Sequence, residues 1–156
     1  MNKRIIAALT ALAFATSPLS ALAQGGAVKL SDGVVKIGVL TDLSGTYSDL
    51  AGAGSVLAAR MAIEDFQAQE KGKAFRIELV SADHQNKGDV ASNKAREWYE
   101  RDQVDMITDL VTTSTALAVM PVAKEKNRIT MVSGAAATLI TGKNCTESNV
   151  HYTYDT

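Results

Sequence analysis

Several signatures of common protein classes are missing from this chain of 156 residues. A single cysteine, Cys145, rules out an internal disulfide. No block of basic residues stands out and the formal net charge is −1, which argues against a nucleic-acid partner. No GxGxxG pattern follows the first apolar stretch, and the GxxxxGK[ST] and GxSxG patterns are absent, so dinucleotide, P-loop and serine-hydrolase chemistry have no support. With 46% hydrophobic residues, the composition is that of a folded globular domain.

The N-terminal segment has the pattern of a cleaved secretory signal peptide. Lys3 and Arg4 precede an apolar run over 5–15, and small residues lead to an expected cleavage after Ala23. A membrane anchor is disfavoured because the run is shorter than the ~20 residues that cross a bilayer. No cysteine follows the cleavage site, so a lipid anchor is not indicated. We expect residues 1–23 to direct export to the periplasm and 24–33 to form a flexible lead-in.

Apolar, β-branched stretches alternate with stretches whose apolar residues recur at helical spacing. The expected strands cover 34–40, 74–83, 104–111, 128–134 and 150–154. The expected helices cover 55–71, a segment from a cap at Asn86 or Asp89 to about 102, and 113–126, with Gly72 ending the first and Pro121 kinking the third. This order predicts an α/β fold, a parallel sheet with helices on both faces.

Four hydroxyl residues, from Thr112 to Thr115, stand where the third strand gives way to a helix. Ligands of open α/β sheets bind beyond the carboxyl ends of the strands. A helix start carries unpaired N–H groups and a partial positive charge, so it can hold a carboxylate. One hydroxyl suffices to cap a helix. The run therefore leaves two interpretations open, a plain cap and a contact to a small anion.

Other loops at the same edge carry weaker signals. Small residues in 133–142 permit close approach of a ligand to the backbone, and also fit ordinary tight packing. In the first loop, Tyr47 could stack on a ligand or lie on the surface. Asp83 beside His84 could act as a general base or metal ligand, but a structural role in the loop is favoured. His151 is remote in sequence, so we expect no metal site.

Four segments together resemble a known family. They are "VKIGVLTDLSGTYSDLAGAGSVLAARMAIEDF", "IELVSADHQNKGDVASNKAREW", "TTSTALAVMPVAKEKNRITMVSGAAATLITG" and the terminal "HYTYDT". They are similar to periplasmic substrate-binding proteins of ABC importers, in the leucine/isoleucine/valine-binding branch of the type I fold. Such proteins clamp a ligand between two α/β lobes. The resemblance implies that 34–156 is an N-terminal lobe, an incomplete first lobe that stops near the first hinge crossing of a longer protein.

The resemblance also implies roles for particular residues. Members of the family that bind amino acids hold the ligand's charged groups with the hydroxyl run and with the loop after the fourth strand. A disulfide that many of them carry near the hydroxyl run has no counterpart, because Val111 occupies that place. The resemblance places Thr112, Thr113, Ala135 and Ala137 at the ligand, with Thr138 adjacent. Together with Tyr47, Ser114 and Tyr154, these are the residues that we expect at the ligand.

The function that follows from the resemblance is capture without catalysis. A small carboxylate-bearing solute, such as a branched-chain or other amino acid or an aromatic acid, would be delivered by a monomeric protein to an inner-membrane permease. Neither a cofactor nor nucleic acid is expected. Two alternatives stay open: an exported enzyme that uses Asp83 and His84, and a sensory module that reports a ligand to a membrane receptor.

Overall fold

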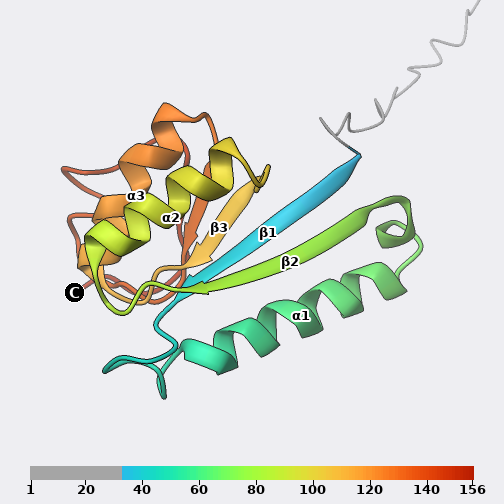
Figure 1. Cartoon of the computed structure of the whole chain (residues 1–156), viewed down its shortest axis with the longest axis horizontal. Coiled ribbons are helices and arrows are strands. Elements are labelled where there is room, and N and C mark those ends of the chain that lie inside the picture. The colour runs from blue at the N-terminus through green and yellow to red at the C-terminus, as the bar shows by residue number, and fades with distance from the viewer. Residues whose placement is uncertain (1–32) are drawn as a thin grey trace, which may run out of the picture.

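The computed structural model describes residues 33–156; the predicted signal peptide and nearly all of the lead-in lie outside this range. Five parallel strands form one sheet in the order β2-β1-β3-β4-β5 (Figure 1). The strands are β1 (Val34–Thr41), β2 (Arg76–Asp83), β3 (Met106–Asp109), β4 (Ile129–Val132) and β5 (Asn149–His151). The helices are α1 (Gly52–Ala68), α2 (Gly88–Glu100) and α3 (Thr113–Glu125), with a short 3-10 turn at Gly72–Ala74.

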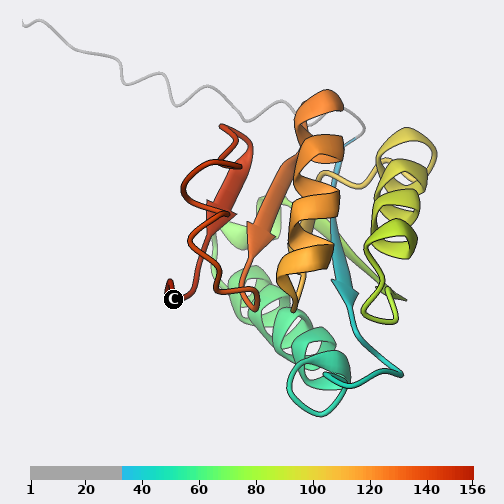
Figure 2. The same cartoon turned by 90° about the vertical axis from the view of Figure 1, so that its left-hand side faces the viewer.

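The helices cover the two faces of the sheet unequally. Helix α1 lies on one face, whereas α2 and α3 lie together on the other (Figure 2). The predicted parallel α/β sheet with helices on both faces is confirmed. Among residues 33–156, no helix combines the length and apolar character needed to cross a membrane.

The main core lies on the side of α2 and α3. On α2, Ala91, Ala95 and Trp98 are buried, which confirms the predicted apolar face and the core role of the tryptophan. Gly38 of β1 makes this packing possible, because a Cβ placed there would lie 2.6 Å from a ring atom of Trp98. The indole therefore rests directly on the backbone of β1, and the tight contact fixes α2 to the sheet.

The ends of α1 and α2 differ from the prediction. Helix α1 begins at Gly52, three residues before the expected start, since this glycine has a φ of 44° and turns the chain into the helix. It ends at Ala68, so Gly72 does not terminate it. The N-cap of α2 is Lys87 in extended backbone, and no side chain caps the helix, so the predicted caps at Asn86 and Asp89 were wrong.

Strand β3 ends two residues earlier than expected. The expected strand reached Val111, but Asp109 and Leu110 have φ values of 80° and 53°. Left-handed backbone cannot continue a strand, and it is rare for residues other than glycine, asparagine and aspartate. The early turn places Val111 and the start of α3 beyond the end of the sheet. Helix α3 itself spans 113–125 with Pro121 inside it.

Candidate functional site

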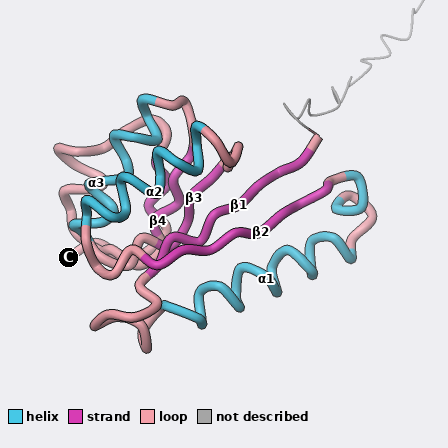
Figure 3. The backbone as a smooth tube through the Cα atoms, in the orientation of Figure 1, coloured by secondary structure: helices cyan, strands magenta, loops and turns pink. Residues whose placement is uncertain are grey.

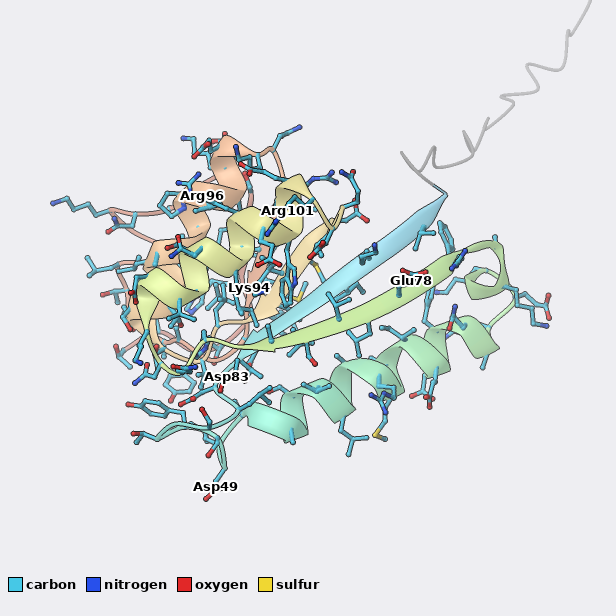
Figure 4. All side chains as sticks on the ribbon, in the orientation of Figure 1. Asp49, Glu78, Asp83, Lys94, Arg96 and Arg101 are labelled. Atoms are coloured by element: carbon cyan, nitrogen blue, oxygen red, sulfur yellow. The ribbon has the colours of Figure 1, made fainter. Side chains whose placement is uncertain are left out.

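Loops at the carboxyl ends of the strands gather at one edge of the sheet (Figure 3). Asp42, directly after β1, organises the first of them. Its carboxylate accepts hydrogen bonds from the backbone N–H groups of Gly45 at 2.7 Å and Tyr47 at 3.0 Å. Tyr47 is half-buried, and Asp49 lies at the far tip of the loop (Figure 4). Asp42 thereby fixes the backbone from which Tyr47 projects.

Asp83, at the end of β2, connects this loop to the next one (Figure 4). Its carboxylate accepts hydrogen bonds from the Leu43 N–H at 3.0 Å, the Gln85 N–H at 2.8 Å and the Ser44 hydroxyl at 2.5 Å. Burial raises its pKa, but these hydrogen bonds outweigh that effect and the net pKa lies below its ordinary value. A carboxylate stabilised in this way is a weak base, so Asp83 serves the structure of the loops.

His84 is fully buried. Its Nδ1 accepts a hydrogen bond from the Asn86 N–H at 3.0 Å, while Nε2 has no partner among the described residues. Burial lowers its pKa, and the negative charges of Asp42, Asp109 and Asp83 oppose this only in part. The ring therefore stays neutral and has no contact with solvent. This geometry fits the structural role predicted for His84, not that of an exposed general base.

Potential ligand atoms of Asp42, Asp83 and His84 all lie within 4.8 Å of one another. Both carboxylates are already used by backbone N–H groups of the loops. The hydrogen bonds that hold the loops therefore explain why these three side chains lie close together. A cation there would compete with the N–H donors.

The buried state of His84 gives a testable pH dependence. Because its folded pKa lies below the ordinary 6.5, the unfolded chain binds more protons as pH falls below 6.5. The contribution of neutral His84 to the free energy of unfolding is therefore fully present above pH 6.5. It decreases below that pH by up to about 1.4 kcal/mol per pH unit. We expect His84→Gln to flatten this loss in denaturant unfolding of the whole protein between pH 5 and 8. Parallel curves for the two proteins would contradict this assignment.

The hydroxyl run is partly a network within the protein. Thr112 is the N-cap of α3, and its hydroxyl donates to Asn86 Oδ1 at 2.8 Å. The hydroxyl oxygen of Thr112 also lies 3.2 Å from the Ser114 hydroxyl and 3.1 Å from the Thr115 hydroxyl. Thr115 is buried and donates to the Thr112 carbonyl at 2.9 Å. The hydroxyl of the half-buried Thr113 makes no hydrogen bond within the described part of the chain.

A cavity of about 280 Å³ opens at the same edge, between the loops. The residues that line it come from the start of α1, the end of β3, the segment after β4 and the C-terminal segment: Leu50, Ala51, Ser55, Asp109, Val111, Ser133, Gly134, Thr153 and Tyr154. Of the residues predicted at the ligand, Tyr154 lines this cavity. Thr112 and Thr113 directly follow the lining residue Val111, and Ala135 directly follows Gly134.

The remaining predicted residues lie in the segment after β4. Ala135 is buried and its carbonyl lies 2.7 Å from Nε2 of His151, which holds this segment against the end of β5. Ala137 is half-buried and its carbonyl accepts from the Ile140 N–H. Thr138 is exposed. These last two residues are not among those that line the cavity.

A second cavity of about 180 Å³ adjoins the first and lies between α1 and the sheet, and Ala58, Ala59, Val39 and Thr108 contribute to its wall. Three polar residues line both cavities: Ser55, Asp109 and Ser133. Sequence reasoning missed all three. Asp109, one of two acids in the expected strand 104–111, was the signal that could have pointed to them.

Comparison with known proteins gives close structural neighbours. A periplasmic binding protein from Burkholderia mallei is 44% identical, with a TM-score of 0.74, over 80% of this chain and 32% of that one. A branched-chain amino acid ABC transporter periplasmic ligand-binding protein from Burkholderia xenovorans is 45% identical, with a TM-score of 0.72, over 78% and 32%. A solute-binding protein from R. palustris, solved with 4-hydroxybenzoate, is 26% identical, with a TM-score of 0.63, over 78% and 32%.

The chain spans about a third of the length of these solved structures. A search of curated proteins gives no match. The neighbours are binding proteins, several of them from transporters, and not enzymes. The family described as periplasmic binding protein matches residues 34–156. Sequence, fold and neighbours therefore agree that this chain belongs to the periplasmic binding protein family.

Proposed function

We propose that this chain is the first lobe of a solute-binding protein that captures a small carboxylate-bearing solute in the periplasm and delivers it to an ABC permease. The observation that carries the proposal is the cavity at the carboxyl edge of the sheet, whose wall includes Val111, two residues before the start of α3. A ligand there lies beside the N-terminus of α3, where unpaired N–H groups favour an anion. A branched-chain amino acid or a hydroxybenzoate matches the ligands named for the neighbours.

Thr113 is the best-placed hydroxyl for this anion. It is the first residue of α3, and its hydroxyl makes no hydrogen bond to other described residues, whereas those of Thr112 and Thr115 are engaged. We assign Ser114 and the backbone near Ala135 to supporting contacts, and Tyr47 and Tyr154 to the walls beside the ligand. A second lobe would then close over the cavity by a hinge motion, and the closed form would dock on the permease. Exclusion of water strengthens charge-assisted hydrogen bonds to the carboxylate.

Two other functions have less support. An enzyme that uses Asp83 and His84 would need an available base, but the carboxylate is occupied by loop donors and the imidazole is buried. A sensory module would use the same cavity and would differ only in the membrane partner that recognises the closed form. Transport and sensing are distinguished by whether the tagged, ligand-loaded protein captures a permease or a receptor from membrane extracts.

Removal of one hydroxyl tests the proposed anion site. In the whole protein, we expect Thr113→Val to weaken binding of the best acid in a panel of leucine, isoleucine, valine and 4-hydroxybenzoate by about tenfold, since a hydrogen bond to a charged group is lost. Isothermal titration calorimetry measures this change. Thr146→Val is the matched control, because the buried Thr146 hydroxyl has no partner among the described residues and lies in the loop before β5.

The control should bind as the unmodified protein does. Equal affinity of the Thr113→Val variant and the unmodified protein would exclude Thr113 from the site. Absence of heat with every acid in the panel, for a protein that unfolds cooperatively, would contradict the proposed function as a whole.

A further inference from the structure

Asp109 is the least expected group at this edge of the sheet. The residue is 4% exposed, yet it lines both the first cavity and the second. Carboxylate oxygen Oδ2 is buried and has no hydrogen-bond partner among the residues described. A buried charge without a partner is costly in free energy, so its presence beside two cavities calls for an explanation.

The backbone at Asp109 adds to that cost. Asp109 and Leu110 both have left-handed φ values, 80° and 53°, an arrangement that the chain adopts only where surrounding contacts enforce it. Those contacts are present: the Leu110 N–H donates to the Leu40 carbonyl at 3.2 Å and the Ser133 N–H donates to the Asp109 carbonyl at 3.1 Å. The strained turn therefore holds Asp109 in place between β1 and β4. Strain of this kind is concentrated at functional sites.

Hydroxyl groups surround the carboxylate without satisfying it. Burial raises the pKa of Asp109, and hydrogen bonding by the hydroxyls of Thr41, Ser55 and Ser133 partly offsets this. Thr41 accepts the Gly52 N–H at 3.1 Å, which leaves its own proton for a carboxylate. A purely structural role would use both oxygens of Asp109, as happens at Asp42 and Asp83. Oδ2 and Nε2 of the electrostatically coupled His84 both have no partner among the described residues, so Oδ2 can still accept a hydrogen bond from a ligand.

We propose that Asp109, with the hydroxyls of Ser55 and Ser133, forms a second subsite that accepts a hydrogen bond from a donor group of the ligand. The inference rests on the proposed function and adds that the ligand carries a hydrogen-bond donor besides its carboxylate. Repulsion between like charges keeps the ligand's carboxylate at the start of α3 and away from Asp109. The ligand is thus an acid with a second polar group, an ammonium or a hydroxyl, and not a simple aliphatic or aromatic acid.

Matched ligand pairs test this subsite in the whole protein by calorimetry. The pairs are leucine with 4-methylpentanoate, which lacks the ammonium group, and 4-hydroxybenzoate with benzoate, which lacks the hydroxyl. In at least one pair we expect the donor-bearing acid to bind about tenfold or more tightly, as a hydrogen bond to a buried charge implies. Asp109→Asn should reduce this preference to within about threefold, because it replaces one acceptor oxygen by a donor.

Asp105→Asn is the matched control, since Asp105 precedes the same strand at its opposite end and pairs with Arg128 at 2.6 Å. It should retain the full preference. If Asp109→Asn fails to unfold cooperatively, Ser133→Ala provides the same test at the neighbouring hydroxyl. Equal binding of both members of each pair, or an unchanged preference in the Asp109 variant, would overturn the subsite and leave the proposed function intact. No binding of any of the four acids would overturn both.

Discussion

Replacing Ile107 with alanine is expected to remove about 2–5 kcal/mol from the free energy of unfolding. Ile107 lies in β3, between β1 and β4, and is fully buried in the main core. The substitution deletes three carbon atoms and leaves a cavity that rigid neighbours on α2 and α3 cannot fill. Because domains are stable by only about 5–15 kcal/mol, the loss is large. Denaturant unfolding of the whole protein measures it.

Two controls make this result specific. Ile107→Val removes one methyl group and should cost only about 0.5–1.5 kcal/mol. Ile129→Ala makes the same chemical change at a residue that is 50% exposed, at the start of β4, and should cost much less than the change at Ile107. Equal losses at positions 107 and 129 would mean that the core is not centred on β3.

Gly134→Ala is expected to destabilise the protein by about 1–3 kcal/mol and to weaken ligand binding as well. A Cβ at this position would lie 2.6 Å from the Cα of Val111, so backbone must move to admit it. Both residues line the first cavity, and Val111 lies two residues before the start of α3. The same displacement that costs stability therefore shifts the start of α3. Denaturant unfolding and calorimetry with the best acid of the panel measure the two effects.

Gly54→Ala is the matched control for this substitution. Gly54 lies in α1 and is exposed, with open space where a Cβ would be added. Alanine there should stabilise the helix by about 0.5–1 kcal/mol, because glycine loses more conformational freedom on folding. A Gly134→Ala protein that is as stable as the unmodified one would show that the junction of β3 and α3 is not tightly packed against the segment after β4.

The order and type of the elements could be predicted because buried parallel strands and amphipathic helices have distinct apolar patterns. Trp98 shows this well, since its helical spacing placed it correctly in the core. The ends were harder to predict, because they depend on backbone angles that the pattern does not encode. At Asp109 and Leu110, a left-handed turn interrupts a sequence that otherwise continues as a strand. Tertiary contacts enforce that turn, and no single-residue preference indicates it.

The candidate site was predictable in its location more than in its chemistry. The parallel topology places the strand ends together, and the family resemblance points to the hydroxyl run; Thr112 and Thr113 directly follow the cavity residue Val111, and their role at the ligand stays a prediction. The hydrogen bond between Thr112 and Asn86 could not be predicted from spacing, since it joins two loops across 26 residues of sequence. Nor could the burial of Asp109, which depends on how α1 lies across the sheet.

The thin cover that α1 provides has a consequence for how such proteins acquire new ligands. Gly52 is the only described residue of α1 that is buried, whereas six residues of α3 are buried. Yet Ser55, Ala58 and Ala59 of α1 form part of the wall of the second cavity. Surface substitutions usually change stability by less than about 0.5 kcal/mol. Substitutions in α1 can therefore reshape the second cavity at low cost in stability, while the start of α3, which is the site proposed for an acid group, stays anchored in the core.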